Sequence, residues 1–285
     1  MDIQFNCYEC IHRQTLTLAN RIGKDDKAKA AAYVDLANIV NLCISNKVTP
    51  PEVAALCYDY FESKTKIKDL FREIKDKSTA LALELYPQLE ELVKTSKDEF
   101  TSRVLLTIAG NVIDFGATPN FKLSDAKDEI LKVFTQPYEQ KNIDLLHQKL
   151  DNAKNVLYIL DNCGEAVIDR LLIEQYAKKI SIVVRGRPIM NDITREDVKA
   201  SKLDFVPVYD TGSNIPGVSL KKSSLEFLNQ YRKADLIIAK GQGNFESFYD
   251  FVEKEAFFLF RVKCPVISQY LNKEPGSIEI RTKNI

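Results

Sequence analysis

Four short apolar runs in the second half of the chain constrain the fold more than any other feature. Each run is rich in β-branched or aromatic residues, and segments with helical spacing, such as 166–177 and 225–231, separate some of them. Runs of this length indicate buried strands, and strands that alternate with helices indicate a parallel sheet with right-handed crossovers. The predicted strands are residues 156–160, 180–184, 205–208 and 236–239.

The first half of the chain has helical patterns and no convincing strand pattern before residue 150. Thr49, two prolines and Glu52 are typical of a helix start, because a hydroxyl caps the helix and proline fits its first turn. Apolar residues recur at helical spacing in 67–74. Pro87 is expected to break or kink the helical stretch around it. Residues 100–113 predict a further helix, buried on most of its circumference.

These patterns predict an α/β protein with two parts. Residues 1–150 are expected to form a helical domain that contributes to a binding pocket, and residues 151–285 a Rossmann-like α/β core with a parallel sheet. The chain has 285 residues, enough for one large domain or two smaller ones. Its hydrophobic content of 45% and charged content of 28% allow a sizeable core and argue against disorder.

Composition also excludes several classes of protein. Lys+Arg and Asp+Glu both number 40, so no basic excess points to nucleic acid. No segment approaches the roughly 20 apolar residues of a membrane helix, and no signal peptide pattern is present, which together predict a soluble cytoplasmic protein. The six cysteines are then expected to be free thiols. With only two histidines, His12 and His147, a His-rich metal site or a Ser-His-Asp triad is poorly supported.

Polar residues follow three of the predicted strands. Asp161 and Asn162 come after the first strand, Asp192 ends the segment 185–192 after the second, and segment 240–246 follows 236–239. The carboxyl ends of parallel strands share the edge where open α/β sheets bind ligands. Asp and Asn also cap helices and build turns, but three together favour a site. Their oxygens suit a magnesium- or manganese-type cation.

The other candidates are less specific. The loop Gly241-Gln242-Gly243-Asn244 could expose backbone N–H groups to a phosphate, or be a simple turn, and it matches neither a dinucleotide fingerprint nor a P-loop. Lys263, before a possible short strand at 266–267, could reach a phosphate or be a solvated surface group. Asn111 and Asp114 could face the site, or the helix could simply end near them. Cys7 and Cys10 form a C-x-x-C without a second pair, so a metal role, a redox role and ordinary thiols stay open.

Taken together, these segments resemble the damage-control phosphatase family (ARMT-like, formerly of unknown function), most closely its short stand-alone microbial branch, over nearly the whole chain. No single motif is decisive, but their order and spacing are specific. The residues that carry the resemblance are Cys7-Tyr8-Glu9-Cys10, Ala109-Gly110-Asn111 with Asp114, Asp161-Asn162-Cys163-Gly164-Glu165, Arg185-Gly186-Arg187-Pro188 with Asn191-Asp192, Lys240-Gly241-Gln242-Gly243-Asn244-Phe245-Glu246, and Lys263-Cys264.

The resemblance implies a metal-dependent phosphatase acting on a small phosphorylated metabolite. By the family pattern, Asp161, Asn162 and Asp192 hold a divalent cation of the magnesium, manganese, cobalt or nickel type, and Lys263 holds phosphate. Asp161, Asp192 and Lys263 are the expected catalytic residues. Relatives carry Asp-Leu-Asn-Tyr-Arg at 242–246, so this chain departs from the pattern there, and Cys163 replaces a residue that is often alanine. The expected substrate-binding residues are Asn111, Asp114, Lys240, Gly241, Gly243, Asn244, Phe245 and Glu246.

The resulting hypothesis is hydrolysis of small phosphate monoesters, such as sugar phosphates or related damaged metabolites. The attacking group is either a water molecule activated by the cation or the Asp161 carboxylate. Two other interpretations stay open: an S-adenosylmethionine-dependent carboxyl methyltransferase, because Rossmann-like folds host that chemistry, and a non-catalytic module that binds metal or phosphate ligands.

Overall fold

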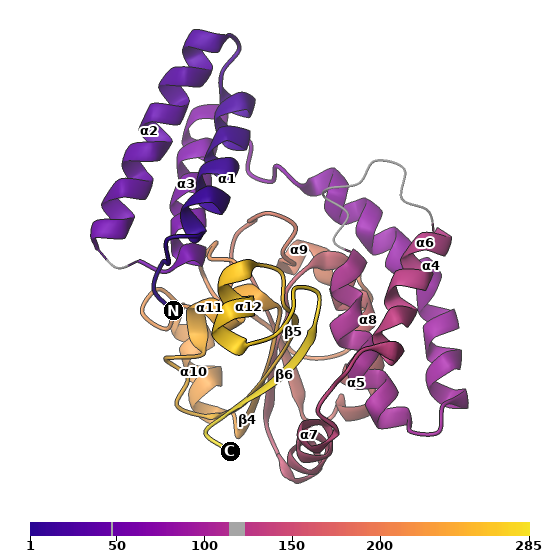
Figure 1. Cartoon of the computed structure of the whole chain (residues 1–285). Helices are drawn as coiled ribbons and strands as arrows, with labels where there is room; N and C mark the ends of the chain where they lie inside the picture. Colours follow the sequence, from indigo (N-terminus) through magenta and orange to yellow (C-terminus); the bar gives the residue numbers. More distant parts are fainter. Residues whose placement is uncertain (47, 114–122) are drawn as a thin grey trace.

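The computed structural model describes residues 1–46, 48–113 and 123–285, and a six-stranded sheet lies at its centre (Figure 1). The strand order is β3-β2-β1-β4-β5-β6, and only the β5–β6 pair is antiparallel. This mostly parallel sheet confirms the α/β class. The strands are β1 (Val156–Ile159), β2 (Ile180–Val184), β3 (Val208–Asp210), β4 (Leu236–Lys240), β5 (Glu255–Arg261) and β6 (Ile278–Lys283).

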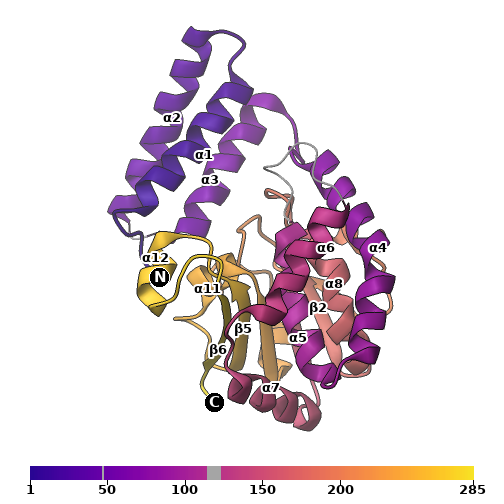
Figure 2. The same cartoon turned by 45° about the vertical axis from the view of Figure 1, so that its right-hand side comes forward.

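Helices cover both faces of the sheet, so its central strands are buried on both sides (Figure 2). Tyr158 and Ile238 point to one face, and Leu157 and Ile237 point to the other. The first face packs against α4 (Arg72–Thr95), α5 (Glu99–Ala109), α6 (Leu123–Leu131), α7 (Gln140–Asn152) and α8 (Cys163–Ile173). The second face packs against α10 (Leu225–Lys233), α11 (Gln242–Phe248) and α12 (Pro265–Leu271).

The first three helices form a separate bundle with its own apolar core (Figures 1 and 2). They are α1 (Cys7–Ile22), α2 (Asp26–Ser45) and α3 (Pro50–Thr65). By contrast, α4 to α7 share one core with the sheet. The packing therefore separates α1–α3 from the rest of the chain, whereas the sequence predicted a boundary at residue 151. Among the described helices, none is both long and apolar enough to cross a membrane.

Two helix expectations need correction. The helical pattern at 67–74 begins too early, because the left-handed Lys66 (φ 63°) ends α3 and an Asp69 side chain accepts from the Phe71 N–H (3.0 Å), so that α4 starts at Arg72. Pro87 does not break α4, which continues to Thr95. It lies on the exposed side, where water can bond the carbonyl group that the missing N–H leaves open.

Two strand expectations are also wrong in part. Of the run 205–208 only Val208 belongs to β3, and Pro207 precedes it because proline cannot donate to a sheet ladder. The short strand expected at 266–267 is part of α12, which Pro265 opens as its first helical residue. The strands β5 and β6 were not predicted. A capping box is present at Thr49, where the sequence predicted a helix start, and another is present at Thr194.

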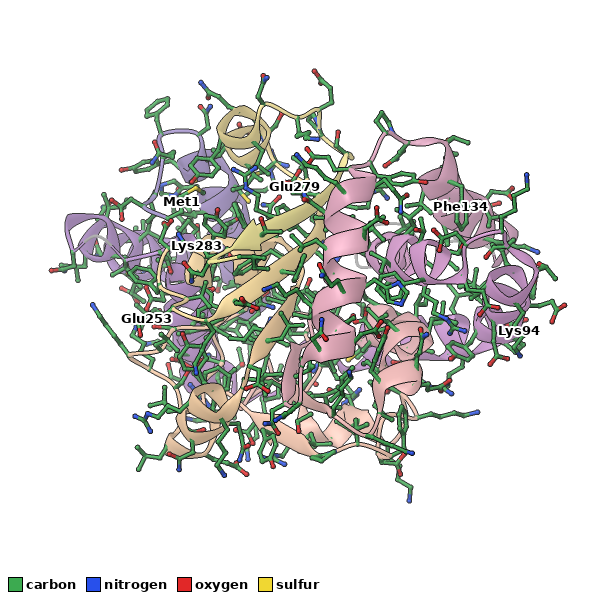
Figure 3. The ribbon with its side chains drawn as sticks, turned by 90° about the horizontal axis from the view of Figure 1, so that it is seen from below. Met1, Lys94, Phe134, Glu253, Glu279 and Lys283 are labelled. Atoms are coloured by element: carbon green, nitrogen blue, oxygen red, sulfur yellow. The ribbon has the colours of Figure 1, made fainter. Side chains whose placement is uncertain are left out.

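The edge strand β6 is covered by α7, which lies along it (Figure 3). The Asn142 side chain donates to the carbonyl group of Ile280 (2.8 Å). Glu279 is buried at this edge, while the Lys283 ammonium group lies over the ring of Tyr249 (4.6 Å). Charged residues and a covering helix are common protections of an edge strand against pairing with other chains.

Candidate active site

The segments that follow β1 and β2 lie side by side and bring together the residues that the sequence proposed as metal ligands. Asn162 and Asp192 face each other in an antiparallel bridge. The Asp161 carbonyl group accepts a hydrogen bond from the N–H of Ile193 (2.9 Å). Asp161, Asn162 and Asp192 are all buried at the carboxyl edge of the sheet. Backbone pairing, rather than side-chain contact alone, makes these three residues neighbours.

The electrostatics of this cluster are unfavourable without a positive charge. Burial raises the pKa of Asp161 well above its usual value, and the nearby carboxylates of Asp192 and Glu165 raise it further. Lys263 and Arg185 act in the opposite direction. Three acidic side chains therefore repel one another in a buried place, and a cation there would relieve the repulsion.

Arg185 lies between two of these carboxylates, although no role in the site was predicted for it. Its Nε donates to Oδ2 of Asp192 (2.6 Å), and its Nη2 lies 3.6 Å from Oδ1 of Asp161. The side chain is fully buried, and neither Nη1 nor Nη2 has a hydrogen-bond partner among the described residues. The sequence feature that could have indicated a role for Arg185 is its position directly after β2, because side chains at the ends of parallel strands reach the ligand edge.

Gly241 packs directly against the Asp161 carboxylate. Its φ of +79° is a left-handed conformation that favours glycine, and it precedes α11. A Cβ atom at this position would lie 2.0 Å from Oδ2 of Asp161. At Gly243 a Cβ atom would lie 2.2 Å from the carbonyl oxygen of Pro216. Of the predicted loop residues, Gly241 is therefore the one held against a predicted metal ligand.

The rest of the predicted loop is placed differently. The Asn244 side chain is fully buried and donates to the carbonyl oxygens of Lys240 (2.6 Å) and Leu160 (3.4 Å), so it joins the ends of β4 and β1. Phe245 lies in the apolar core, with its ring centroid 4.9 Å from that of Phe260. Both Asn244 hydrogen bonds thus run to backbone carbonyl groups and not to the carboxylates of the cluster.

Glu246 and Lys263 are connected through Gln242. The Gln242 amide donates to the Glu246 carboxylate (2.6 Å), and its oxygen accepts from the backbone N–H of Lys263 (2.8 Å). Burial raises the pKa of Glu246, while Gln242 and Lys263 lower it. Lys263 is exposed, and its charge acts on both Glu246 and Asp161. An exposed lysine charge beside the carboxylate cluster can hold a phosphoryl oxygen.

Lys240, predicted to bind substrate, lies beneath the cluster with no part of its side chain exposed. Its ammonium group donates to the carbonyl oxygen of Thr107 (2.8 Å), to Glu165 (2.7 Å) and to Asp169 (2.6 Å). Burial alone would lower the pKa of Lys240, but Asp169 and Glu165 raise it above its ordinary value. All three N–H donors are engaged, so the lysine supports the site from below.

Asn111 reaches the cluster from the helical half of the chain. It lies in the short helix η1 (Gly110–Ile113), where α5 gives way to a tighter turn, so the predicted end of the helix is observed. Its Nδ2 donates to Glu165 (2.6 Å) and to Asp161 (3.4 Å). Asp114, predicted as its companion, lies outside the described residues.

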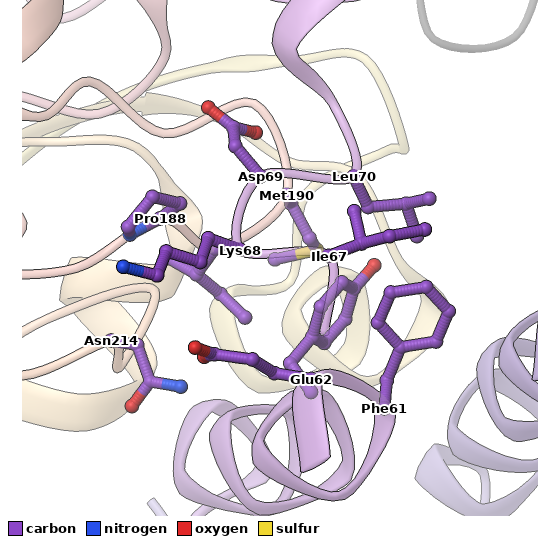
Figure 4. A pocket seen from close by; sticks show the side chains of 11 residues that line it. Phe61, Glu62, Ile67, Lys68, Asp69, Leu70, Pro188, Met190 and Asn214 are labelled. Carbon is purple, nitrogen blue, oxygen red and sulfur yellow. The ribbon is translucent and has the colours of Figure 1, made fainter. Parts of the chain in front are cut away.

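The helical bundle faces the segment that carries Asp192. The Asp192 carboxylate raises the pKa of Tyr58, on α3, beyond the larger effect of burial. Gln14, on α1, donates to the sulfur of Met190 (3.3 Å), and Met190 has a left-handed backbone (φ 43°). Figure 4 shows a cavity at this junction. One wall is formed by residues of α3 and the segment after it, and the opposite wall by the segment after β2. The lining residues include Tyr58, Phe61, Glu62 and Lys68 on the first wall and Pro188 and Met190 on the second.

The N-terminal C-x-x-C lies near another part of the site. Burial raises the pKa of both thiols, Cys7 and Cys10, and the charges of Glu246 and Cys264 raise them further. All six cysteines are free. Within residues 1–46, 48–113 and 123–285, no three His, Cys, Asp or Glu side chains are arranged to hold a metal ion. The predicted set of Asp161, Asn162 and Asp192 is not such a group, because Asn162 supplies a carboxamide oxygen instead of a carboxylate.

The donor chemistry of the cluster fits a hard divalent cation. Two carboxylates and one carboxamide supply oxygen donors, which Mg²⁺ and Mn²⁺ prefer. Glu165 adds further negative charge, while Gly241 leaves no side chain in the space beside Asp161. Open α/β sheets bind small ligands at the carboxyl ends of their strands. The fold and the buried acidic site at this edge place the protein in that class.

Comparison with known proteins identifies the family. The Damage-control phosphatase ARMT1-like domain matches residues 3–278. The chain is 33% identical to an uncharacterized protein, MJ0202, of Methanocaldococcus jannaschii, with 96% of this chain and 93% of that protein covered. It is 31% identical to the damage-control phosphatase PH1575 of Pyrococcus horikoshii, with 98% and 97% covered. The crystal structure of that DUF89 family protein matches with a TM-score of 0.86, covering 99% of this chain and 100% of the other.

This chain belongs to the damage-control phosphatase family, as the sequence resemblance implied. Membership supports a phosphatase role for the protein. The matched residues run through both halves of the chain, so the helical bundle is part of the family domain and not an addition to it.

Proposed function

We propose that this protein is a metal-dependent phosphatase that hydrolyses small phosphate monoesters, such as sugar phosphates or related damaged metabolites. The observation that carries the proposal is the convergence of Asp161, Asn162 and Asp192 at one buried point, where the pKa of Asp161 is raised by burial and by its acidic neighbours. Neighbouring buried carboxylates disfavour each other's ionisation, and a bound divalent cation reverses this effect.

Asp161, Asn162 and Asp192 would hold a divalent cation of the magnesium, manganese, cobalt or nickel type. When bound, such a cation screens the charge of a phosphoryl group and lowers the pKa of water. Arg185 holds Asp192 in place through its Nε (2.6 Å), so this carboxylate stays oriented before any ligand arrives. Preorganised charge of this kind is usually the largest contribution to phosphoryl transfer.

The surrounding residues would bind the substrate. Lys263, whose charge reaches Asp161, would hold phosphoryl oxygens, together with the backbone at Gly241. Asn111 would orient the leaving group from the side of the helical half, with Asp114 as the companion that the sequence suggests. Tyr58, whose pKa is raised by burial and by the Asp192 carboxylate, lies on the side of the bundle, where the organic part of a small ester would extend.

The proposal is tested by measuring phosphate release from sugar phosphates and nucleotides with Mg²⁺, Mn²⁺, Co²⁺ or Ni²⁺. Asp161→Asn and Asp192→Asn should each lower the rate by more than about 100-fold, because even groups that only orient metal ligands contribute 10–100-fold. Asp161→Asn should fold, since it removes one repelling charge. Asp192→Asn takes the charge from the partner of the buried Arg185 but keeps an oxygen that can accept from its Nε, so circular dichroism of this variant is measured alongside its activity. Asp204→Asn, at an exposed position, is the matched control and should keep full activity. Full activity in either site variant contradicts the proposal.

The two candidate attacking groups can be separated in the same system. If the Asp161 carboxylate attacks, a phosphorylated protein accumulates in rapid-quench experiments with labelled substrate. If water attacks, no labelled protein forms at any time. Calorimetric binding of S-adenosylmethionine by metal-free protein, without any phosphate release, would instead favour the methyltransferase interpretation.

A further inference from the structure

Beneath the proposed metal ligands lies a buried ion cluster whose function the phosphatase proposal does not explain. Lys240, Glu165 and Asp169 are each at most 1% exposed. The Lys240 ammonium group joins one oxygen of each carboxylate, and the hydroxyl of Tyr158 donates to the same Asp169 oxygen (2.9 Å). Three buried charges are costly unless they are paired and hydrogen-bonded, and an apolar core of the same volume often serves stability as well. A function at the neighbouring site would account for them.

The second oxygen of Glu165 connects this cluster to the site. Oε2 accepts from Nδ2 of Asn111 (2.6 Å) and from Nδ2 of Asn162 (3.4 Å). The same two Nδ2 atoms also donate to Oδ2 of Asp161, at 3.4 and 3.0 Å. Both NH₂ groups therefore point between two carboxylates. Since an amide has a donor end and an acceptor end, both carbonyl oxygens must point the other way.

We propose that Glu165 is a positioning residue: held by Lys240, it fixes the orientation of two amides so that Asn162 turns its carbonyl oxygen to the cation and Asn111 turns its own to the substrate. The inference rests on the proposed metal-dependent function and deepens it. Carboxylates that orient metal ligands from behind typically contribute 10–100-fold to metal affinity. Lys240 thus acts through Glu165, without contact to the substrate.

Glu165→Gln is the informative substitution, because it keeps the shape of the side chain. The carbonyl oxygen of the new side chain would turn to the Lys240 ammonium group, which can only donate. Its NH₂ group would then face the NH₂ groups of Asn111 and Asn162. Two donors cannot bond, so the amides must rotate or shift. Titration calorimetry with Mn²⁺ alone should show affinity weakened by about 10–100-fold.

Asp169→Asn is the matched control. It removes the other carboxylate partner of Lys240, yet it touches neither amide, and its oxygen can still accept from Tyr158. Its Mn²⁺ affinity should stay within about threefold of wild type, below the range seen when a group that orients a ligand is lost. Urea unfolding of both variants reports whether stability changes alike. Equal Mn²⁺ affinity for Glu165→Gln and wild type overturns the inference, as does equal weakening in both variants.

A measurement on the wild-type protein keeps the inference testable if Glu165→Gln does not fold. In a crystal structure with Mn²⁺, the Asn162 carbonyl oxygen should bind the metal while Nδ2 stays within hydrogen-bond distance of Glu165. Direct coordination of Mn²⁺ by Glu165 overturns the positioning role. Failure of the two proposals can be distinguished: wild-type protein that binds no Mn²⁺ overturns the metal site itself, whereas tight binding that is unchanged in Glu165→Gln overturns only the role of Glu165.

Discussion

At Gly241 one backbone position controls the space around a buried carboxylate. The left-handed φ of +79° excludes most side chains on conformational grounds. A Cβ atom would lie only 2.0 Å from Oδ2 of Asp161, which excludes all side chains on steric grounds. The two effects have different consequences. Backbone strain lowers stability, whereas the steric clash displaces a predicted metal ligand.

A pair of alanine substitutions separates these effects. Gly276 also has a left-handed conformation (φ +88°), but there a Cβ atom would meet nothing closer than 3.5 Å. Both Gly241→Ala and Gly276→Ala should lose about 1 kcal/mol or more of unfolding free energy through backbone strain. Only Gly241→Ala should also lose Mn²⁺ affinity and phosphate release, by at least about tenfold. If both variants keep the same activity, Gly241 is not part of the site.

Among the elements, α4 is fixed to the segment that carries Asp192 by a buried ion pair. Lys75 on α4 is fully buried and lies 3.3 Å from Asp197, in α9 (Arg195–Val198). Asp197 also accepts from the N–H (2.8 Å) and hydroxyl (2.7 Å) groups of Thr194. Although burial raises it, the pKa of Asp197 is held below its ordinary value by Lys75 and these hydrogen bonds. The ionised form therefore stabilises the fold.

Asp197→Asn should lower the unfolding free energy at pH 7 by about 2 kcal/mol, because the buried Lys75 would keep only Asp69 (3.2 Å) as an anionic partner and Arg72 would lose its charged partner in α9. The folded-state pKa lies below the unfolded value of about 3.9, so this stabilisation is present above that pH and is lost as pH falls through the folded pKa. Urea unfolding should show the wild-type advantage shrinking below about pH 4. Asp76→Asn, which removes an exposed partner of Arg72, should cost less than about 1 kcal/mol. If the difference in unfolding free energy between wild type and Asp197→Asn did not depend on pH, the Lys75–Asp197 ion pair would not be its source.

The position of the ligand edge could be predicted from the sequence, because the order and direction of the strands are enough to determine it. Once 156–160 and 180–184 are parallel neighbours, Asp161 and Asp192 must emerge at the same edge. The roles of Arg185 and Lys240 could not be predicted in this way. Both lie at the ends of such strands, yet Arg185 inserts between carboxylates and Lys240 turns beneath them. These placements depend on contacts with Asp161 and Glu165, which come from another part of the sequence.

The missed strands have a similar explanation. β5 is built largely from phenylalanine and leucine, which suit a buried helix equally well by pattern alone. At 266–267 two β-branched residues suggested a strand, but Pro265 and the preceding Cys264 N-cap set the start of a helix. Local pattern failed where tertiary packing decided between the two structures.

At the scale of the whole molecule, the bundle of α1 to α3 is held against the α/β body next to the site. Arg187 donates to Asp59 on α3 (2.8 Å), and Asn214 donates to the same carboxylate (2.8 Å). Tyr58, the preceding residue on α3, lies close enough to Asp192 to be affected by its charge. The proposed metal ligands come from the body, whereas Tyr58 comes from the bundle. We therefore expect the chemistry to depend on the body and substrate choice to depend on the bundle (Figure 1).

The proposed function depends most on Asp161, Asn162 and Asp192 forming one metal site. An anomalous difference map from crystals of the wild-type protein soaked in Mn²⁺, recorded near the manganese absorption edge, tests this directly. We expect a peak bound by oxygens of all three residues, and its absence from crystals of Asp192→Asn. A strong peak elsewhere, with none beside Asp161 at saturating Mn²⁺, would contradict the proposed site.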